Sequence, residues 1–180
     1  MKHPKAQVVT VLALVLLASG CSQPTEQKRA FEVPDSLCDT PIPAELLSPV
    51  LPASGKKITE EQKPGNGYFR CTVSVDDNSV LNASWAWWEK GTKATKVAAT
   101  QWGVKLDEHV SEDGTYTYSD KGGVGHVTCP EPSVPTRKTE GDLFAEIFIS
   151  DDGQPDEEAM KNLIQAYAKA VSASSECVQK

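Results

Sequence analysis

Alternating apolar and polar positions on both sides of a short turn form the clearest pattern in the chain. Residues 69–75 alternate in this way, and residues 81–87 do so again after the turn formers at residues 76–79. Such alternation puts every second side chain on one buried face, so the pattern predicts an antiparallel hairpin. Its inward positions are Phe69, Cys71, Val73, Val75, Leu81, Ala83, Trp85 and Trp87.

Three more strands are predicted in the second half of the chain, at residues 116–118, 124–129 and 142–150. The last of these has apolar side chains at both odd and even positions, with Phe144 and Phe148 on the face opposite the others. A strand with two apolar faces is expected to be covered on both sides.

Apolar positions with helical spacing predict three helices. Two are short, at residues 43–48 and 92–102. The third begins near Pro155, with Asp151 or Asp152 as a possible N-cap and acidic residues in its first turn. Its apolar stripe consists of Met160, Leu163, Ile164, Tyr167 and Val171.

The order of these elements predicts the fold class. Residues 56–66 are polar and rich in turn formers, so we expect a loop there. The remaining elements predict an α+β fold, with a mainly antiparallel sheet of four to five strands and about three helices packed on it. Residues 35–180 are long enough for one such domain.

The N-terminus has the pattern of an export signal. Lys2 and Lys5 precede an apolar run at residues 8–17. This run is too short to cross a bilayer as a helix and suits the hydrophobic region of a signal peptide. Residues 17–21 then read Leu-Ala-Ser-Gly-Cys, which resembles the lipobox of bacterial lipoproteins.

That resemblance implies a lipid anchor. Residues 1–20 would be the signal peptide, diacylglycerol would be attached to the Cys21 thiol, and the new amine would be acylated, for example with palmitate. Residues 21–34 would form the lipid anchor and a flexible tether, because they are polar and lack periodicity. The alternative is an ordinary secretory signal, with Cys21 as a free thiol.

The remaining four cysteines predict two disulfides, because an even number is typical of an exported domain. Three connectivities are possible. We favour Cys38–Cys71 with Cys129–Cys177, since each bridge would tie the edge of a helix to a neighbouring strand. The main alternative joins Cys71 to Cys129, because both lie on inward strand faces. Metal binding is less favoured, because no Cys-x-x-Cys pair occurs.

The layout of these features resembles a group of poorly characterised actinobacterial lipoproteins. Members have a lipobox, a polar tether, a first cysteine shortly before a Leu-Leu helix and a second cysteine in the next strand. Here these are Cys21, Cys38, Leu46 with Leu47, and Cys71. The resemblance covers residues 17–90. Similar two-disulfide domains occur as extracellular sensor modules, so the resemblance implies binding rather than catalysis.

Charge narrows the range of partners. The chain has 25 acidic and 18 basic residues, and removal of Lys2 and Lys5 with the signal peptide makes the mature part more acidic. Phosphate backbones should repel such a chain, so nucleic acid is not an expected partner. Because polybasic attraction to lipid is also missing, membrane contact is expected through the lipid on Cys21, on the extracytoplasmic face of the cell membrane.

Motifs of catalytic sites are missing from the sequence. No Gly-x-Ser-x-Gly motif occurs, and we interpret His109 and His126 as surface histidines. Residues 121–125 lack the Gly-Lys-Ser/Thr ending of a phosphate loop and predict a turn that enters a strand. Residues 151–156 do not follow the EF-hand pattern, so we interpret them as helix capping. We therefore predict no catalytic residue, metal or cofactor.

The aromatic residues offer the best candidate for a ligand surface. Trp88 should point away from the buried face of Trp85 and Trp87. With Trp102, Tyr116 or Tyr118 it could line a binding surface. We expect a non-enzymatic binding or sensor-like module. The alternatives are a structural or accessory protein that contacts other envelope proteins, and then an enzyme.

Overall fold

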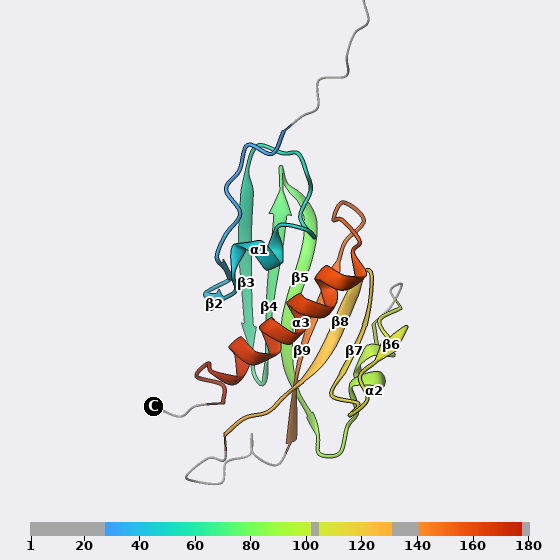
Figure 1. Cartoon of the computed structure of the whole chain (residues 1–180). Helices are drawn as coiled ribbons and strands as arrows, with labels where there is room; N and C mark the ends of the chain where they lie inside the picture. Colours follow the sequence, from blue (N-terminus) through green and yellow to red (C-terminus); the bar gives the residue numbers. More distant parts are fainter. Residues whose placement is uncertain (1–27, 102–104, 131–140, 178–180) are drawn as a thin grey trace, which may run out of the picture.

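A single antiparallel sheet of seven strands dominates the computed structural model, which describes residues 28–101, 105–130 and 141–177 (Figure 1). In spatial order the strands are β3 (Ile58–Gly65), β4 (Tyr68–Val75), β5 (Asn78–Glu89), β9 (Gly141–Ile149), β8 (Gly122–Val127), β7 (Tyr116–Ser119) and β6 (His109–Val110). Two short strands, β1 (Ser36–Leu37) and β2 (Thr40–Pro41), pair separately. The predicted hairpin at residues 69–87 is confirmed by the pairing of β4 with β5.

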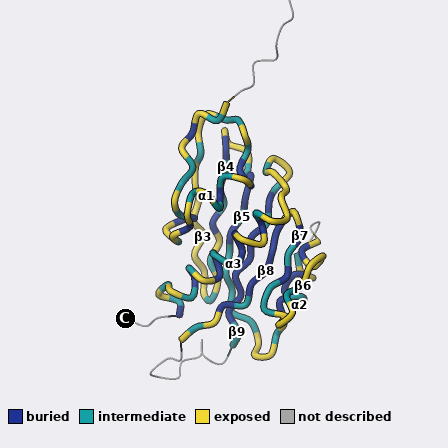
Figure 2. The backbone as a smooth tube through the Cα atoms, viewed as in Figure 1, coloured by how far each residue is buried: buried dark blue, intermediate teal, exposed yellow. Residues whose placement is uncertain are grey.

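The predicted fold class is wrong. The protein is mostly β, with 18% helix and seven strands in the main sheet instead of four to five. The prediction missed β6, which has only two residues, and β3, which was expected to be a loop. Seven of the eight residues of β3 are exposed, and Figure 2 shows this strand largely in the colour of exposed residues, so it has no apolar alternation. Backbone hydrogen bonds to β4 hold this edge strand instead.

Three helices lie against the two faces of the sheet. They are α1 (Ala44–Leu47), α2 (Ala94–Ala98) and α3 (Glu157–Ser172). The α3 helix crosses one face, and its predicted apolar stripe is buried there. Asp156, rather than Asp151 or Asp152, is its N-cap, because the Asp156 carboxylate accepts a hydrogen bond from the Ala159 amide at 2.9 Å. Among the described helices, none is long and apolar enough to cross a membrane.

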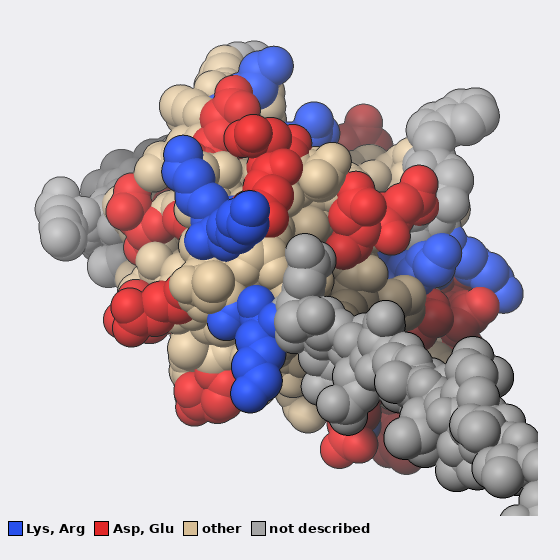
Figure 3. Space-filling model, turned by 90° about the horizontal axis from the view of Figure 1, so that it is seen from above, with Lys and Arg blue, Asp and Glu red and all other residues tan. Residues whose placement is uncertain are grey.

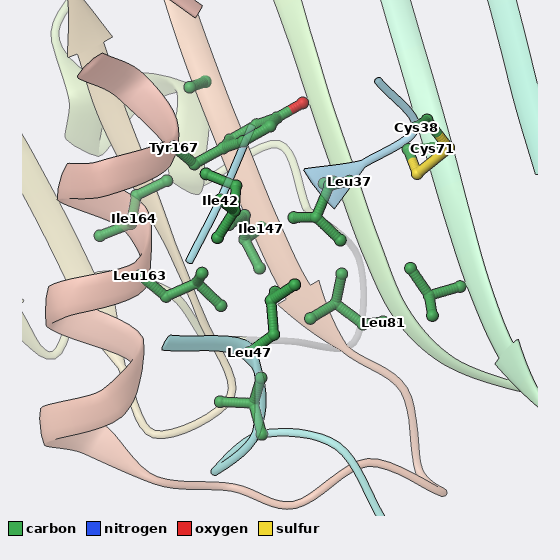
Figure 4. Packing of buried hydrophobic residues seen from close by; sticks show 14 of the residues in the cluster. Leu37, Cys38, Ile42, Leu47, Cys71, Leu81, Ile147, Leu163, Ile164 and Tyr167 are labelled. Carbon is green, nitrogen blue, oxygen red and sulfur yellow. A yellow bond between two sulfur atoms is a disulfide. The ribbon is translucent and has the colours of Figure 1, made fainter. Parts of the chain in front are cut away.

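The main core lies between α3, α1 and one face of the sheet. Figure 4 shows Tyr167, Ile164 and Leu163 of α3 directed toward Ile147 of β9 and Leu81 of β5. A smaller cluster lies on the opposite face, where α2 covers β8 and β9. Its members are Ala94, Val97, Ala98, Leu106, Val124 and Phe144. The prediction that the strand at residues 142–150 is covered on both sides is therefore confirmed.

Two disulfides connect the periphery to this core, with the favoured pairing. Cys38 bonds to Cys71 of β4, and Cys129 bonds to Cys177 beyond α3. The bridges close loops with sequence separations of 33 and 48 residues. The chain-entropy relation assigns about 4 kcal/mol to each. Two such bridges indicate an oxidising, extracytoplasmic compartment.

The folded body begins before Asp35, where the tether was expected to end. Phe31 is in the main core, and the Arg29 guanidinium binds the end of the α1 segment. This guanidinium donates hydrogen bonds of 2.8 to 3.0 Å to Ser48 and to the Leu51 and Pro52 carbonyls. Residues from Arg29 onward therefore belong to the domain. Cys21 and the predicted signal peptide lie outside the described residues.

Candidate functional site

The predicted ligand surface is divided between the two faces of the sheet. Trp85 and Trp87 pack against the main core as expected, and Trp88 points the other way, against the smaller cluster. The Trp88 indole nitrogen is buried without a hydrogen-bond partner among the described residues. Tyr116 and Tyr118 lie on the α3 face. Trp102 lies outside the described residues.

The two tyrosines lie beside polar side chains of α3. The Lys161 ammonium lies 6.0 Å from the centre of the Tyr118 ring. The His109 ring, from the edge strand β6, stacks on the Tyr118 ring with a centroid distance of 5.2 Å. His109 Nε2 in turn lies 3.1 Å from a carboxylate oxygen of Glu157. Tyr118 thus contacts both a cationic and an aromatic neighbour.

A shallow hollow of about 370 Å³ lies beside Tyr116, between the ends of β7 and β8 and the second half of α3. Its lining residues are Tyr116, His126, Thr128, Gln165, Ala168, Lys169 and Ser172. Hereafter, the β7–α3 site means this hollow together with Tyr118 and Lys161. It combines two aromatic rings with an amide, two ammonium groups and hydroxyl groups.

Helical spacing and glycines create this site. One side of α3 carries a row of polar residues spaced four apart. These are Glu157, Lys161, Gln165 and Lys169. The glycines of β8 let the helix and the Tyr116 ring approach the strand. A Cβ atom at Gly125 would lie 2.8 Å from the Tyr116 ring and 3.1 Å from the Ala168 side chain.

The turn before β7 sets the electrostatics of Tyr116. Asp113 accepts hydrogen bonds from the Ser111 hydroxyl and from the Thr115 hydroxyl and amide, and these lower the pKa of its carboxyl to about 2. Burial of Tyr116 raises the pKa of its phenol, and the Asp113 charge raises it further. The Tyr116 hydroxyl therefore keeps its proton and can donate a hydrogen bond to a ligand.

Sequence reasoning missed a buried carboxyl group on the opposite face. Glu146 of β9 is 5% exposed, and burial raises the pKa of its carboxyl to about 7. The Gln101 amide donates a hydrogen bond to this carboxyl and, together with the more distant Arg70 charge, opposes the shift. The sequence held a signal, because Glu146 lies between Phe144 and Phe148 on the second apolar face of its strand.

The other candidate groups from the sequence have structural roles. Within the described chain, the group with metal-like spacing is Cys38, Cys71 and Glu60, but both sulfurs form the disulfide and offer no thiolate. His126 lies 3.4 Å from Asp142. It belongs to β8, which is separated from the Cys71 strand β4 by β5 and β9. The glycine-rich residues 121–125 lead into β8.

No family model, curated protein or solved structure matches the chain.

Proposed function

We propose that the protein is a lipoprotein held by Cys21 on the extracytoplasmic face of the cell membrane. Its domain serves as a non-enzymatic binding or sensor-like module. The hollow of about 370 Å³ beside Tyr116 carries the binding part of the proposal. The two disulfides support export, and the lipobox-like residues 17–21 support the anchor.

The side chains of the β7–α3 site favour a polar ligand of the glycan type. The half-buried ring of Tyr116, which lines the hollow, offers apolar contact to the carbon face of a sugar. The Gln165 amide and the Lys169 ammonium can hydrogen-bond its hydroxyl groups. A few polar groups around an aromatic surface are typical of ligand sites, where they fix the orientation of the ligand.

A purely structural contact role has less support. Among the described residues, the exposed large apolar side chains are Tyr68, at 44%, and Val110, at 51%. Tyr68 belongs to β4 and Val110 to β6, and these strands lie near opposite edges of the sheet. They do not form the contiguous apolar patch that protein interfaces of this kind use.

Calorimetric titration of the mature protein with a panel of envelope glycans tests the ligand class. We expect one glycan class to bind, and the Gln165→Ala and Lys169→Ala variants to weaken it about tenfold each. Neither side chain is in the core, so both variants should fold. Asn162→Ala, another exposed position of α3, is the matched control and should leave the affinity unchanged. Equal affinities in all variants would place the ligand elsewhere.

Intact mass and fractionation test the anchor. The mature protein should begin at Cys21, carry the mass of attached acyl chains and remain with the membrane fraction. The Cys21→Ser variant should be released or stay unprocessed. A Cys21→Ser protein that is still processed and membrane-bound would overturn the anchor while leaving the glycan proposal intact.

A further inference from the structure

A second hollow, of about 410 Å³, lies where β5 turns into α2. Its lining residues are Glu89, Lys90, Gly91, Thr92, Lys93, Thr95 and Lys96. We call it the lysine hollow. Three ammonium groups thus occur within seven residues, in a chain with a formal net charge of −7. Lys90, Lys93 and Lys96 are all exposed, and none is in an ion pair with a carboxylate of the described chain.

The backbone under these lysines is fixed. The Gly91 amide donates a 2.6 Å hydrogen bond to Asp142, and Gly91 has a φ of +83°, which favours glycine at this turn. Ala94 and Val97 are buried in the smaller core cluster, so α2 turns Lys93 and Lys96 outward. The lysines therefore project from a packed scaffold, and the Asp142 carboxylate is occupied by the backbone.

The chemistry of the lysine hollow suits phosphate groups. Ammonium groups bind phosphate as point charges, and the hydroxyls of Thr92 and Thr95 can donate to phosphate oxygens. Because the lysines are solvated, a single phosphate would gain little from them. Several phosphates on one chain would gain more, since each further contact is intramolecular. A linear polyanion therefore fits this hollow better than a free ion.

The lysine hollow lies at the opposite end of β5 from the N-terminal attachment. Phe31 and Val75 meet at Gly55, beside the start of β5, whereas the lysine hollow lies at its other end (Figure 1). The twelve residues of β5 extend about 40 Å. At the attachment end, acidic side chains are interspersed with the basic ones (Figure 3).

We propose that the lysine hollow binds a linear phosphate-bearing polyanion at the end of the domain farthest from its N-terminal attachment. The orientation away from the bilayer rests on the proposed anchor, but the binding itself does not. The chain as a whole has a formal net charge of −7, which opposes a polyanion, so the attraction is local: the lysine hollow sets three ammonium groups against the single Glu89 carboxylate.

Titration of the mature protein with polyphosphate tests this site. With about three charge contacts, the logarithm of the affinity should fall with the logarithm of the salt concentration with a slope of about −2. Joint substitution Lys90→Gln, Lys93→Gln and Lys96→Gln should weaken binding at least about tenfold and flatten this slope. The control changes the same charge at the attachment end, with Lys28→Gln, Lys56→Gln and Lys57→Gln, and should bind as the wild type does.

Equal weakening by both triple variants would show a general charge effect and overturn the site, as would failure of the wild type to bind polyphosphate. Two further titrations separate the sources of phosphate. Inorganic phosphate should bind at least about tenfold more weakly than polyphosphate at equal phosphate concentration. Protein anchored in phosphatidylglycerol vesicles should bind polyphosphate at about 0.15 M salt as tightly as protein anchored in phosphatidylcholine vesicles, and clearly weaker binding in phosphatidylglycerol would overturn the orientation. None of these outcomes depends on glycan binding at the β7–α3 site.

Discussion

Replacement of Glu146 by glutamine should stabilise the protein at neutral and alkaline pH. Glu146 is 5% exposed, and its carboxyl has a pKa of about 7 in the folded chain against an ordinary value of 4.5. The native state therefore holds a proton that the unfolded state releases between these two pH values. Stability from this group is fully present below pH 4.5 and is lost as the pH rises through about 7.

The size of the loss follows from the two pKa values. At about 1.4 kcal/mol for each pKa unit, the gap between 4.5 and about 7 corresponds to about 3 kcal/mol above pH 7. Glutamine has nearly the same shape and cannot ionise. Its side-chain oxygen can still accept the hydrogen bond from Gln101, so the variant should avoid this loss without opening a cavity.

Urea unfolding at pH 5 and pH 8, followed by tryptophan fluorescence, measures the effect. Glu146→Gln should match the wild type within about 1 kcal/mol at pH 5 and exceed it by about 3 kcal/mol at pH 8, which moves the midpoint by about 1 to 2 M urea. Glu112→Gln removes a charge from an exposed position and should change stability by less than about 0.5 kcal/mol at both pH values. A Glu146→Gln protein that is less stable than the wild type at pH 8 would refute the reasoning.

Three further changes test the packing of the domain, each by urea unfolding. Joint replacement of Cys38 and Cys71 by alanine should lower the free energy of unfolding by about 4 kcal/mol, and unchanged stability would mean that this bridge does not form. Tyr167→Phe should raise stability by about 1 kcal/mol, because the buried hydroxyl has no hydrogen-bond partner among the described residues; a loss of stability would reveal a partner for it. Asp156→Ala should cost about 1 kcal/mol through loss of the α3 N-cap, whereas Asp152→Ala should cost nothing measurable.

Apolar periodicity could predict the interior of this fold but not its edges. The spacing of apolar residues correctly predicts which faces are buried in the β4–β5 hairpin, in the two-sided strand β9 and in α3. The edge strand β3 buries almost nothing, so its place in the sheet depends on backbone hydrogen bonds, which any polar sequence can make. With β3 and β6 missing, both the number of strands and the fold class were predicted wrongly.

The site depended even more on contacts between distant parts of the chain. Trp88 could be assigned to the opposite face from Trp85 by alternation alone. The neighbours of Tyr116 and Tyr118 could not be assigned in this way, because α3 lies about 40 residues further along the chain. The glycines of β8 predict a turn that enters a strand, but the close approach of α3 that they permit is visible only in the structure. The same holds for the Glu146 carboxyl and its Gln101 partner.

Nuclear magnetic resonance of the isotopically labelled mature protein, titrated with the envelope glycan panel, tests the proposed binding role most directly. We predict that one glycan class shifts the amide signals of Tyr116, Gln165 and Lys169 in a saturable way and leaves those of β3 and β4 unchanged. Shifts confined to other elements, or no saturable shift with any glycan, would contradict a glycan-binding role for the β7–α3 site.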